Sequence, residues 1–106
     1  MDKTKAIDAL AALAQPTRLD AFRKLVKAYP DAIAAGEIAR MCKVPHNTMS
    51  GHLAILSRAG LIAARKDGRT IHYSADIAGI QALIGFLMRD CCGGGAEICA
   101  PLVERI

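Results

Sequence analysis

The chain has 106 residues, of which 53% are hydrophobic and 23% charged, and this composition is typical of one globular domain rather than of a disordered protein. Aromatic residues make up 4% of the chain and there is no Trp, which argues against recognition of single-stranded nucleic acid by base stacking. No apolar run reaches the roughly 18 residues that a membrane span needs, so we expect a cytoplasmic protein without membrane contact. The formal charge of +4 and the pI near 9.1 suit a polyanionic partner.

Four helices are predicted in the first part of the chain. Residues 3–14 and 16–28 carry apolar side chains at helical spacing, and Pro16 cannot extend the first helix but is suited to open the second. A short helix is expected at about 35–42 and a longer one at 45–58, and only a short turn separates them. Two helices joined in this way predict a helix-turn-helix motif.

Two extended segments and a last helix follow. The segments 61–66 and 69–74 flank the dipeptide Asp67-Gly68, which is typical of a hairpin turn. Residues 76–90 return to a helical period, after which three consecutive glycines break any helix. The predicted fold is therefore mainly α with a small β-hairpin, in the order α-α-α-α-β-β-α.

This order of elements is that of a winged helix-turn-helix, in which the second helix of the motif enters the major groove and the hairpin touches the DNA backbone or minor groove. Polar groups at the start of the helix at 45–58 suit base edges or phosphates, a glycine there allows close approach, and three cations flank the hairpin tip. The alternative is that all of them are ordinary solvated residues. The residues predicted to contact double-stranded DNA are His46, Asn47, Thr48, Ser50, Gly51, Arg65, Lys66 and Arg69.

Three further residues fit structural roles better than functional ones. His52 lies near the edge of an apolar helix face, so we expect packing or a structural hydrogen bond rather than a base contact. His72, on a wing strand, is expected to be a surface residue rather than a ligand. Cys42 shares the apolar face of its helix with Ile38 and is expected to be a small core residue.

The other three cysteines lie close together near the C-terminus. Two of them are adjacent and the N-terminus predicts an amphipathic helix rather than a signal peptide, so they are interpreted as thiols for metal or redox chemistry. Three glycines would let Cys99 fold back towards Cys91 and Cys92. Soft sulfur ligands favour thiophilic centres, and three-coordinate trivalent arsenic or antimony suits three thiolates better than tetrahedral zinc does. An organoarsenical needs only two thiolates, so Cys91 and Cys92 would suffice for one.

Two segments resemble the ArsR/SmtB family of metal-responsive repressors. PHNTMSGHLAILSRAGLIAARKDGRTIHYSAD resembles the family's recognition helix and wing, and ALAQPTRLDAFRKL resembles the start of its second helix. The resemblance implies an obligate homodimer joined through the first and last helices, a palindromic operator, and release from DNA when an inducer binds. Independently, the strongly apolar helix at 76–90 favours a small dimer that would cover it.

The family's known sensor sites match this chain in only one place. The zinc site of some relatives lacks ligands here, because the helix at 76–90 contains no His and has acidic residues only at its ends. The best-known arsenic sensors carry a cysteine cluster before the recognition helix, where this chain has Cys42 alone. A subset of arsenic-responsive relatives has a Cys-Cys pair at the end of the terminal helix and a third Cys downstream, which Cys91, Cys92 and Cys99 resemble.

The sequence therefore predicts a repressor, not an enzyme, that leaves operator DNA when arsenite, antimonite or an organoarsenical binds these cysteines, with no organic cofactor. The alternatives are a winged-helix repressor that senses redox state or another soft metal such as cadmium, lead or copper(I), and a DNA-binding module without a sensor. A thiol-redox enzyme is a further alternative, but the chain has no Cys-x-x-Cys motif. We expect a DNA-binding and dimerisation domain at 1–92 and a flexible tail at 93–106 that contributes Cys99.

Overall fold

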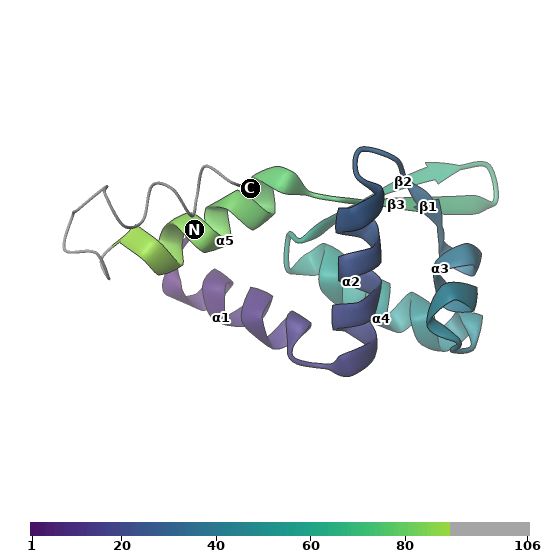
Figure 1. Ribbon diagram of the computed structural model, residues 1–106, viewed down its shortest axis with the longest axis horizontal. Helices are drawn as coiled ribbons and strands as arrows, with labels where there is room; N and C mark the ends of the chain where they lie inside the picture. The colour runs from purple at the N-terminus through teal and green to yellow at the C-terminus, as the bar shows by residue number, and fades with distance from the viewer. Residues whose placement is uncertain (90–106) are drawn as a thin grey trace.

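The computed structural model describes residues 1–89, which form five helices and a three-stranded antiparallel sheet (Figure 1). None of these helices is long and apolar enough to cross a membrane. The helices and hairpin expected from the sequence are confirmed, with bounds that move by about one residue. The elements are α1 (Lys3–Leu13), α2 (Pro16–Ala28), β1 (Ile33–Ala34), α3 (Ala35–Cys42), α4 (His46–Arg58), β2 (Ile62–Asp67), β3 (Thr70–Ala75) and α5 (Ile77–Arg89).

Local hydrogen bonds explain where the first helices begin. The carboxylate of Asp2 accepts a hydrogen bond from the backbone N–H of Lys5 at 2.8 Å, which caps α1. The side-chain oxygen of Gln15 accepts from the N–H of Arg18 at the same distance, and Pro16 takes the first position of α2. The chain therefore passes from α1 to α2 with the N–H of Arg18 paired, and the start of α1 has its own cap.

The sheet contains one strand that the sequence did not predict. β1 pairs with β3, with Ile33 opposite Tyr73, and the strand order is β1-β3-β2. A strand of two residues leaves no alternating pattern in the sequence, so only its tertiary pairing defines it. Because α3 begins directly after β1, this pairing joins the wing to the helix-turn-helix.

The hairpin turn lies one residue later than predicted. Asp67 pairs with Thr70, so the two turn residues are Gly68 and Arg69 rather than Asp67 and Gly68. Gly68 has a φ of +64°, which glycine adopts without strain and which suits the first central position of a two-residue hairpin turn. Arg69 is consequently placed at the tip of the wing.

The core lies between α2, α3, α4 and the sheet, and its largest fully buried side chains are Leu25, Ile38, Met49, Leu53, Leu56 and Leu61. The buried residues of helix α1 are all small, namely Ala6, Ala9 and Ala12, and the partly buried Leu13 packs against the core at its end. The larger side chains of the same helix, Ile7 and Leu10, are 55% and 44% exposed. Figure 1 shows α1 and α5 extending together from one end of the molecule.

Helix α5 packs closely on the turn that follows α4. The N–H of Asp76 donates to the carbonyl oxygen of Leu61 at 3.0 Å, and the Asp76 carboxylate accepts from the N–H of Gly79 at 3.0 Å. A Cβ atom at Gly79 would lie 1.8 Å from the carbonyl oxygen of Gly60, so only glycine fits there. The start of α5 is thus in direct contact with the backbone of Gly60, in the turn that follows α4.

We expect Gly79→Ala to lower the free energy of unfolding by about 1–3 kcal/mol, because the added methyl group must displace the backbone of Gly60. Gly85→Ala is the matched control, since Gly85 lies on the same helix and a Cβ there meets nothing within 4 Å. The control should be as stable as the wild type or more stable by roughly 0.5–1 kcal/mol. Urea unfolding followed by circular dichroism measures both, and an unchanged stability of Gly79→Ala would contradict the close contact.

Candidate nucleic-acid interface

Helix α4 has one buried side and one exposed side. Met49, Leu53 and Leu56 are buried on the first. The second side faces solvent, and the first two turns of the helix carry only small or polar groups there. The predicted DNA contacts on this helix are all exposed: His46, Asn47, Thr48, Ser50 and Gly51.

The first turn of α4 lacks a side-chain N-cap. Its N-cap residue, Pro45, makes no side-chain capping hydrogen bond. The side-chain oxygen of Asn47 accepts from the N–H of Thr48 at 3.0 Å, and the Ser50 hydroxyl donates to the carbonyl oxygen of His46 at 3.1 Å. An uncapped helix start carries a partial positive charge and suits a phosphate group.

A groove of about 410 Å³ lies between this helix start and the wing. It brings together two predicted residues of α4, His46 and Ser50, with Arg69 of the wing. Its remaining lining residues are Ala34, Ala35, Gly36, Thr70, Ile71 and Tyr73. The start of α3 also has no side-chain cap, so two helix starts and one arginine face a single groove.

Two residues of this groove were missed by the sequence reasoning. Gly36 lies in the first turn of α3, and Thr70 lies beside the wing tip. Neither carries a local signal, because both reach the groove through the pairing of β1 with β3 and through the register of the hairpin. A threonine hydroxyl and an exposed glycine backbone are both suited to contact with a phosphate.

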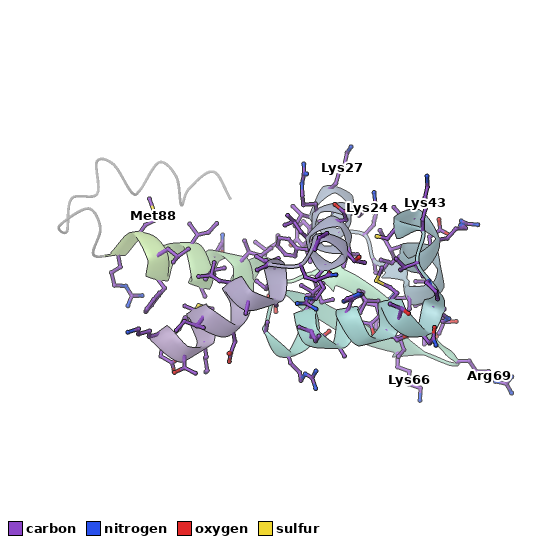
Figure 2. All side chains as sticks on the ribbon, turned by 90° about the horizontal axis from the view of Figure 1, so that it is seen from below. Lys24, Lys27, Lys43, Lys66, Arg69 and Met88 are labelled. Atoms are coloured by element: carbon purple, nitrogen blue, oxygen red, sulfur yellow. The ribbon has the colours of Figure 1, made fainter. Side chains whose placement is uncertain are left out.

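The wing separates the three predicted cations. Side chains alternate along a strand, so Lys66, opposite Ile71, lies on the face that also carries the buried Tyr73. Arg65, opposite His72, lies on the other face. Figure 2 shows Lys66 and Arg69 projecting from the same side of the molecule. The fold therefore places Lys66 and Arg65 on opposite faces of the wing, with Arg69 at its tip.

Of the two remaining histidines, His52 makes the structural hydrogen bond predicted for it, whereas His72 is less exposed than predicted. His52 is half-buried, and its Nδ1 atom lies 3.4 Å from Nη1 of Arg18. His72 is half-buried on β3. In residues 1–89, no group of three or more His, Cys, Asp or Glu side chains could hold a metal ion.

Cys42 packs against the core, as predicted, but is only partly buried. Burial raises the pKa of its thiol, nearby Lys24 opposes this shift, and Asp20 adds to it. A thiol with a raised pKa is a poor nucleophile and a poor metal ligand at neutral pH, because the thiolate is the reactive form. The predicted sensor residues Cys91, Cys92 and Cys99 lie outside the described residues.

An exposed recognition helix, a basic wing and the groove between them define a DNA-binding winged helix-turn-helix protein. Comparison with known proteins agrees: residues 13–65 match the family described as "Helix-turn-helix domain". The transcriptional activator HlyU of Vibrio cholerae serotype O1 is 30% identical over 91 residues, covering 86% of this chain and 82% of HlyU. A structure of HlyU has a TM-score of 0.66 and 31% identity, covering 87% of this chain and 99% of that one.

Two further solved structures carry the same arrangement. An ArsR-like transcriptional regulator from Rhodococcus sp. RHA1 has a TM-score of 0.75 and 26% identity, covering 92% of this chain and 90% of that one. A possible transcriptional regulator for arsenical resistance has a TM-score of 0.67 and 27% identity, covering 93% of this chain and 96% of that one. The chain belongs to the ArsR family of winged-helix transcriptional regulators, of which HlyU is a relative, and it is not an enzyme.

Gly51→Ala should separate stability from DNA binding. A Cβ at Gly51 meets nothing within 4 Å, so we expect the variant to be more stable by about 0.5–1 kcal/mol. We expect its affinity for DNA to fall by about tenfold, or about 1.4 kcal/mol, because the methyl group would hinder approach to the duplex. Fluorescence anisotropy with a duplex selected by the wild-type protein measures this affinity, and Gly85→Ala serves as the control. Unchanged affinity would show that the duplex does not approach Gly51.

The raised pKa of Cys42 predicts slow alkylation. In a Cys91→Ser, Cys92→Ser, Cys99→Ser variant, Cys42 is the only thiol. The rate of its reaction with iodoacetamide should rise with pH through a midpoint above that of free cysteine, because the pKa of the folded thiol is raised and less thiolate is present at any given pH. The same variant in concentrated urea should return to the midpoint of free cysteine. A midpoint at or below that of free cysteine in the folded protein would contradict the desolvation of this thiol.

Proposed function

We propose that the protein is a homodimeric repressor that leaves its operator when trivalent arsenic binds Cys91, Cys92 and Cys99. The observation that carries the DNA-binding part is the groove in which His46, Ser50 and Arg69 meet two uncapped helix starts. In this arrangement α4 enters the major groove, and the wing tip lies against the phosphate backbone.

Exposed apolar side chains support a dimer joined through α1 and α5. Ile7 and Leu10 of α1 and Leu87 of α5 are 55%, 44% and 44% exposed. Among the described residues of α5, only Leu83 is buried. A second copy that covers both helices removes this apolar surface from water, and its two-fold symmetry places two recognition helices on a palindromic operator.

The chemistry of the cysteines supports a soft inducer. Cys91 and Cys92 follow α5 after a single intervening residue, Asp90, and Cys99 comes seven positions after Cys92. Trivalent arsenic takes three thiolates in a pyramidal arrangement, and arsenite is the inducer that this set fits best. The relative described as a possible regulator for arsenical resistance supports the same inducer. Antimonite has the same ligand preference, and an organoarsenical needs two of the three thiols.

The packing of α5 supports a route from these cysteines to DNA. The start of α5 contacts the end of the α4 segment through Gly79 and Gly60 and through the hydrogen bond from Asp76 to Leu61. A displacement of α5 in the dimer is therefore passed to the recognition helix. To change operator occupancy from 99:1 to 1:99, the inducer must favour the released conformation by about 5.5 kcal/mol.

The proposal predicts the outcome of an arsenite titration of the reduced protein, followed by near-ultraviolet absorption and by counting the remaining thiols. We expect saturation at one arsenite per chain with three thiols lost, and release of the selected operator duplex over the same concentration range. Cys91→Ser should bind DNA like the wild type but should not respond to arsenite. Cys42→Ser is the matched control and should respond normally.

Other outcomes of this titration would replace parts of the proposal. Loss of thiols to disulfides under mild oxidation, without arsenite binding, would favour a redox sensor. Tight binding of cadmium, lead or copper(I) without arsenite binding would favour another soft metal. Arsenite binding that leaves the protein on the duplex would contradict its role as an inducer.

A further inference from the structure

We propose that Arg18 positions the recognition helix by a hydrogen bond to His52, and that acidification weakens operator binding because this bond requires a neutral imidazole. The inference rests on the proposed operator binding and adds a positioning residue and a dependence on pH to it.

One guanidinium joins three helices. Arg18 belongs to the first turn of α2, and its Nε atom donates to the carbonyl oxygen of Ala12, in the last turn of α1, at 2.7 Å. Its Nη2 atom lies 3.5 Å from the carbonyl oxygen of Ala11. Its Nη1 atom lies 3.4 Å from Nδ1 of His52, in the middle of α4. Carbonyl groups at the end of a helix lack partners within the helix, so a cation there is favourable.

The direction of the bond to His52 follows from the chemistry of the two groups. A guanidinium has only donors, so Nδ1 of His52 must be the acceptor. The imidazole is then neutral and carries its proton on Nε2. When His52 takes a second proton, Nδ1 becomes a donor, the hydrogen bond is lost, and two cations stand 3.4 Å apart. An imidazole changes charge between about pH 5 and pH 8.

No other charged group in residues 1–89 pairs with His52 to offset this repulsion. Asp8 of α1 and Arg58 of α4 line a hollow of about 400 Å³ together with Arg18, but none of them forms an ion pair among the described residues. Helix α1 also carries Lys3 and Lys5. The charged groups on the other elements packed against α4 are Asp20, Arg23, Lys24 and Lys27 of α2, the mutually paired Glu37 and Arg40 of α3, Lys43 after α3, and Arg65, Lys66 and Asp67 of β2.

The position of the bond connects it to DNA recognition. His52 directly follows Gly51 and lies one helical turn after Thr48, so it anchors the segment of α4 that faces the duplex. At its other end, Arg18 holds the C-terminal turn of α1, the helix that carries the exposed Ile7 and Leu10. Loss of the bond would loosen the recognition helix from the helix that joins the two copies.

The test compares the operator affinity of the wild type and three variants, His52→Asn, Arg18→Lys and His72→Asn. Fluorescence anisotropy measures each affinity at about pH 7.5 and about pH 5.5 at constant ionic strength. His52→Asn places an amide oxygen near the position of Nδ1, so it accepts from Arg18 and does not titrate. Arg18→Lys removes the fork that reaches both helices. His72→Asn is the matched control, because it removes a half-buried histidine from the wing strand.

We expect the ratio of Kd at the lower pH to Kd at the higher pH to be at least about fivefold larger in the wild type and His72→Asn than in His52→Asn and Arg18→Lys. His46 is unchanged in all four proteins, so its contribution to binding cancels in the comparison. An equal ratio in the wild type and His52→Asn, or in the wild type and Arg18→Lys, would overturn the proposal.

A second measurement needs no DNA and separates this inference from the proposed function. Nitrogen NMR of the imidazoles at neutral pH should show His52 with an unprotonated Nδ1 in the wild type, and Arg18→Lys should change that signal while leaving His72 as it is. A protonated Nδ1 at neutral pH would overturn the inference even if operator binding is normal. The expected tautomer together with no binding to any duplex would instead overturn the proposed function.

Discussion

The burial of one side of α4 governs the arrangement of the whole interface. Met49, Leu53 and Leu56 lie in the core formed with α2, α3 and the sheet, and their burial removes apolar surface from water. With that side held in place, the opposite side of the helix must face solvent. The groove beside the wing exists because α3 packs against α4 and β1, directly before α3, pairs with β3 of the wing.

Both helices that would join two copies of the chain also contact the recognition helix or its end. Arg18 of α2 bonds both to the end of α1 and to His52 of α4. Gly79 of α5 contacts Gly60, in the turn that follows α4. The first contact depends on protonation, whereas the second depends only on the absence of a side chain. A displacement of α1 or α5 at the proposed dimer interface would therefore affect the DNA-binding surface through two physically different contacts.

DNA binding and the proposed inducer binding depend on different parts of the chain. The ArsR family arrangement accounts for DNA binding with residues 1–89, and this part of the chain contains no cluster of metal ligands. The partly buried Cys42, whose thiol has a raised pKa, is poorly suited to act as a sensor. The proposed inducer therefore depends on Cys91, Cys92 and Cys99, whose thiolates are soft ligands.

The sequence by itself determined the helices, the hairpin, the exposed polar start of α4 and the structural role of His52, because these features depend on the spacing of neighbours along the chain. Tertiary structure alone decided the pairing of β1, the turn at Gly68 and Arg69, and the separation of Arg65 from Lys66. It also decided that the buried residues of α1 are small alanines, and that Gly79 of α5 approaches Gly60 too closely for a side chain at position 79. Strand register and backbone contact depend on residues far apart in the chain, and no local pattern records which of them meet.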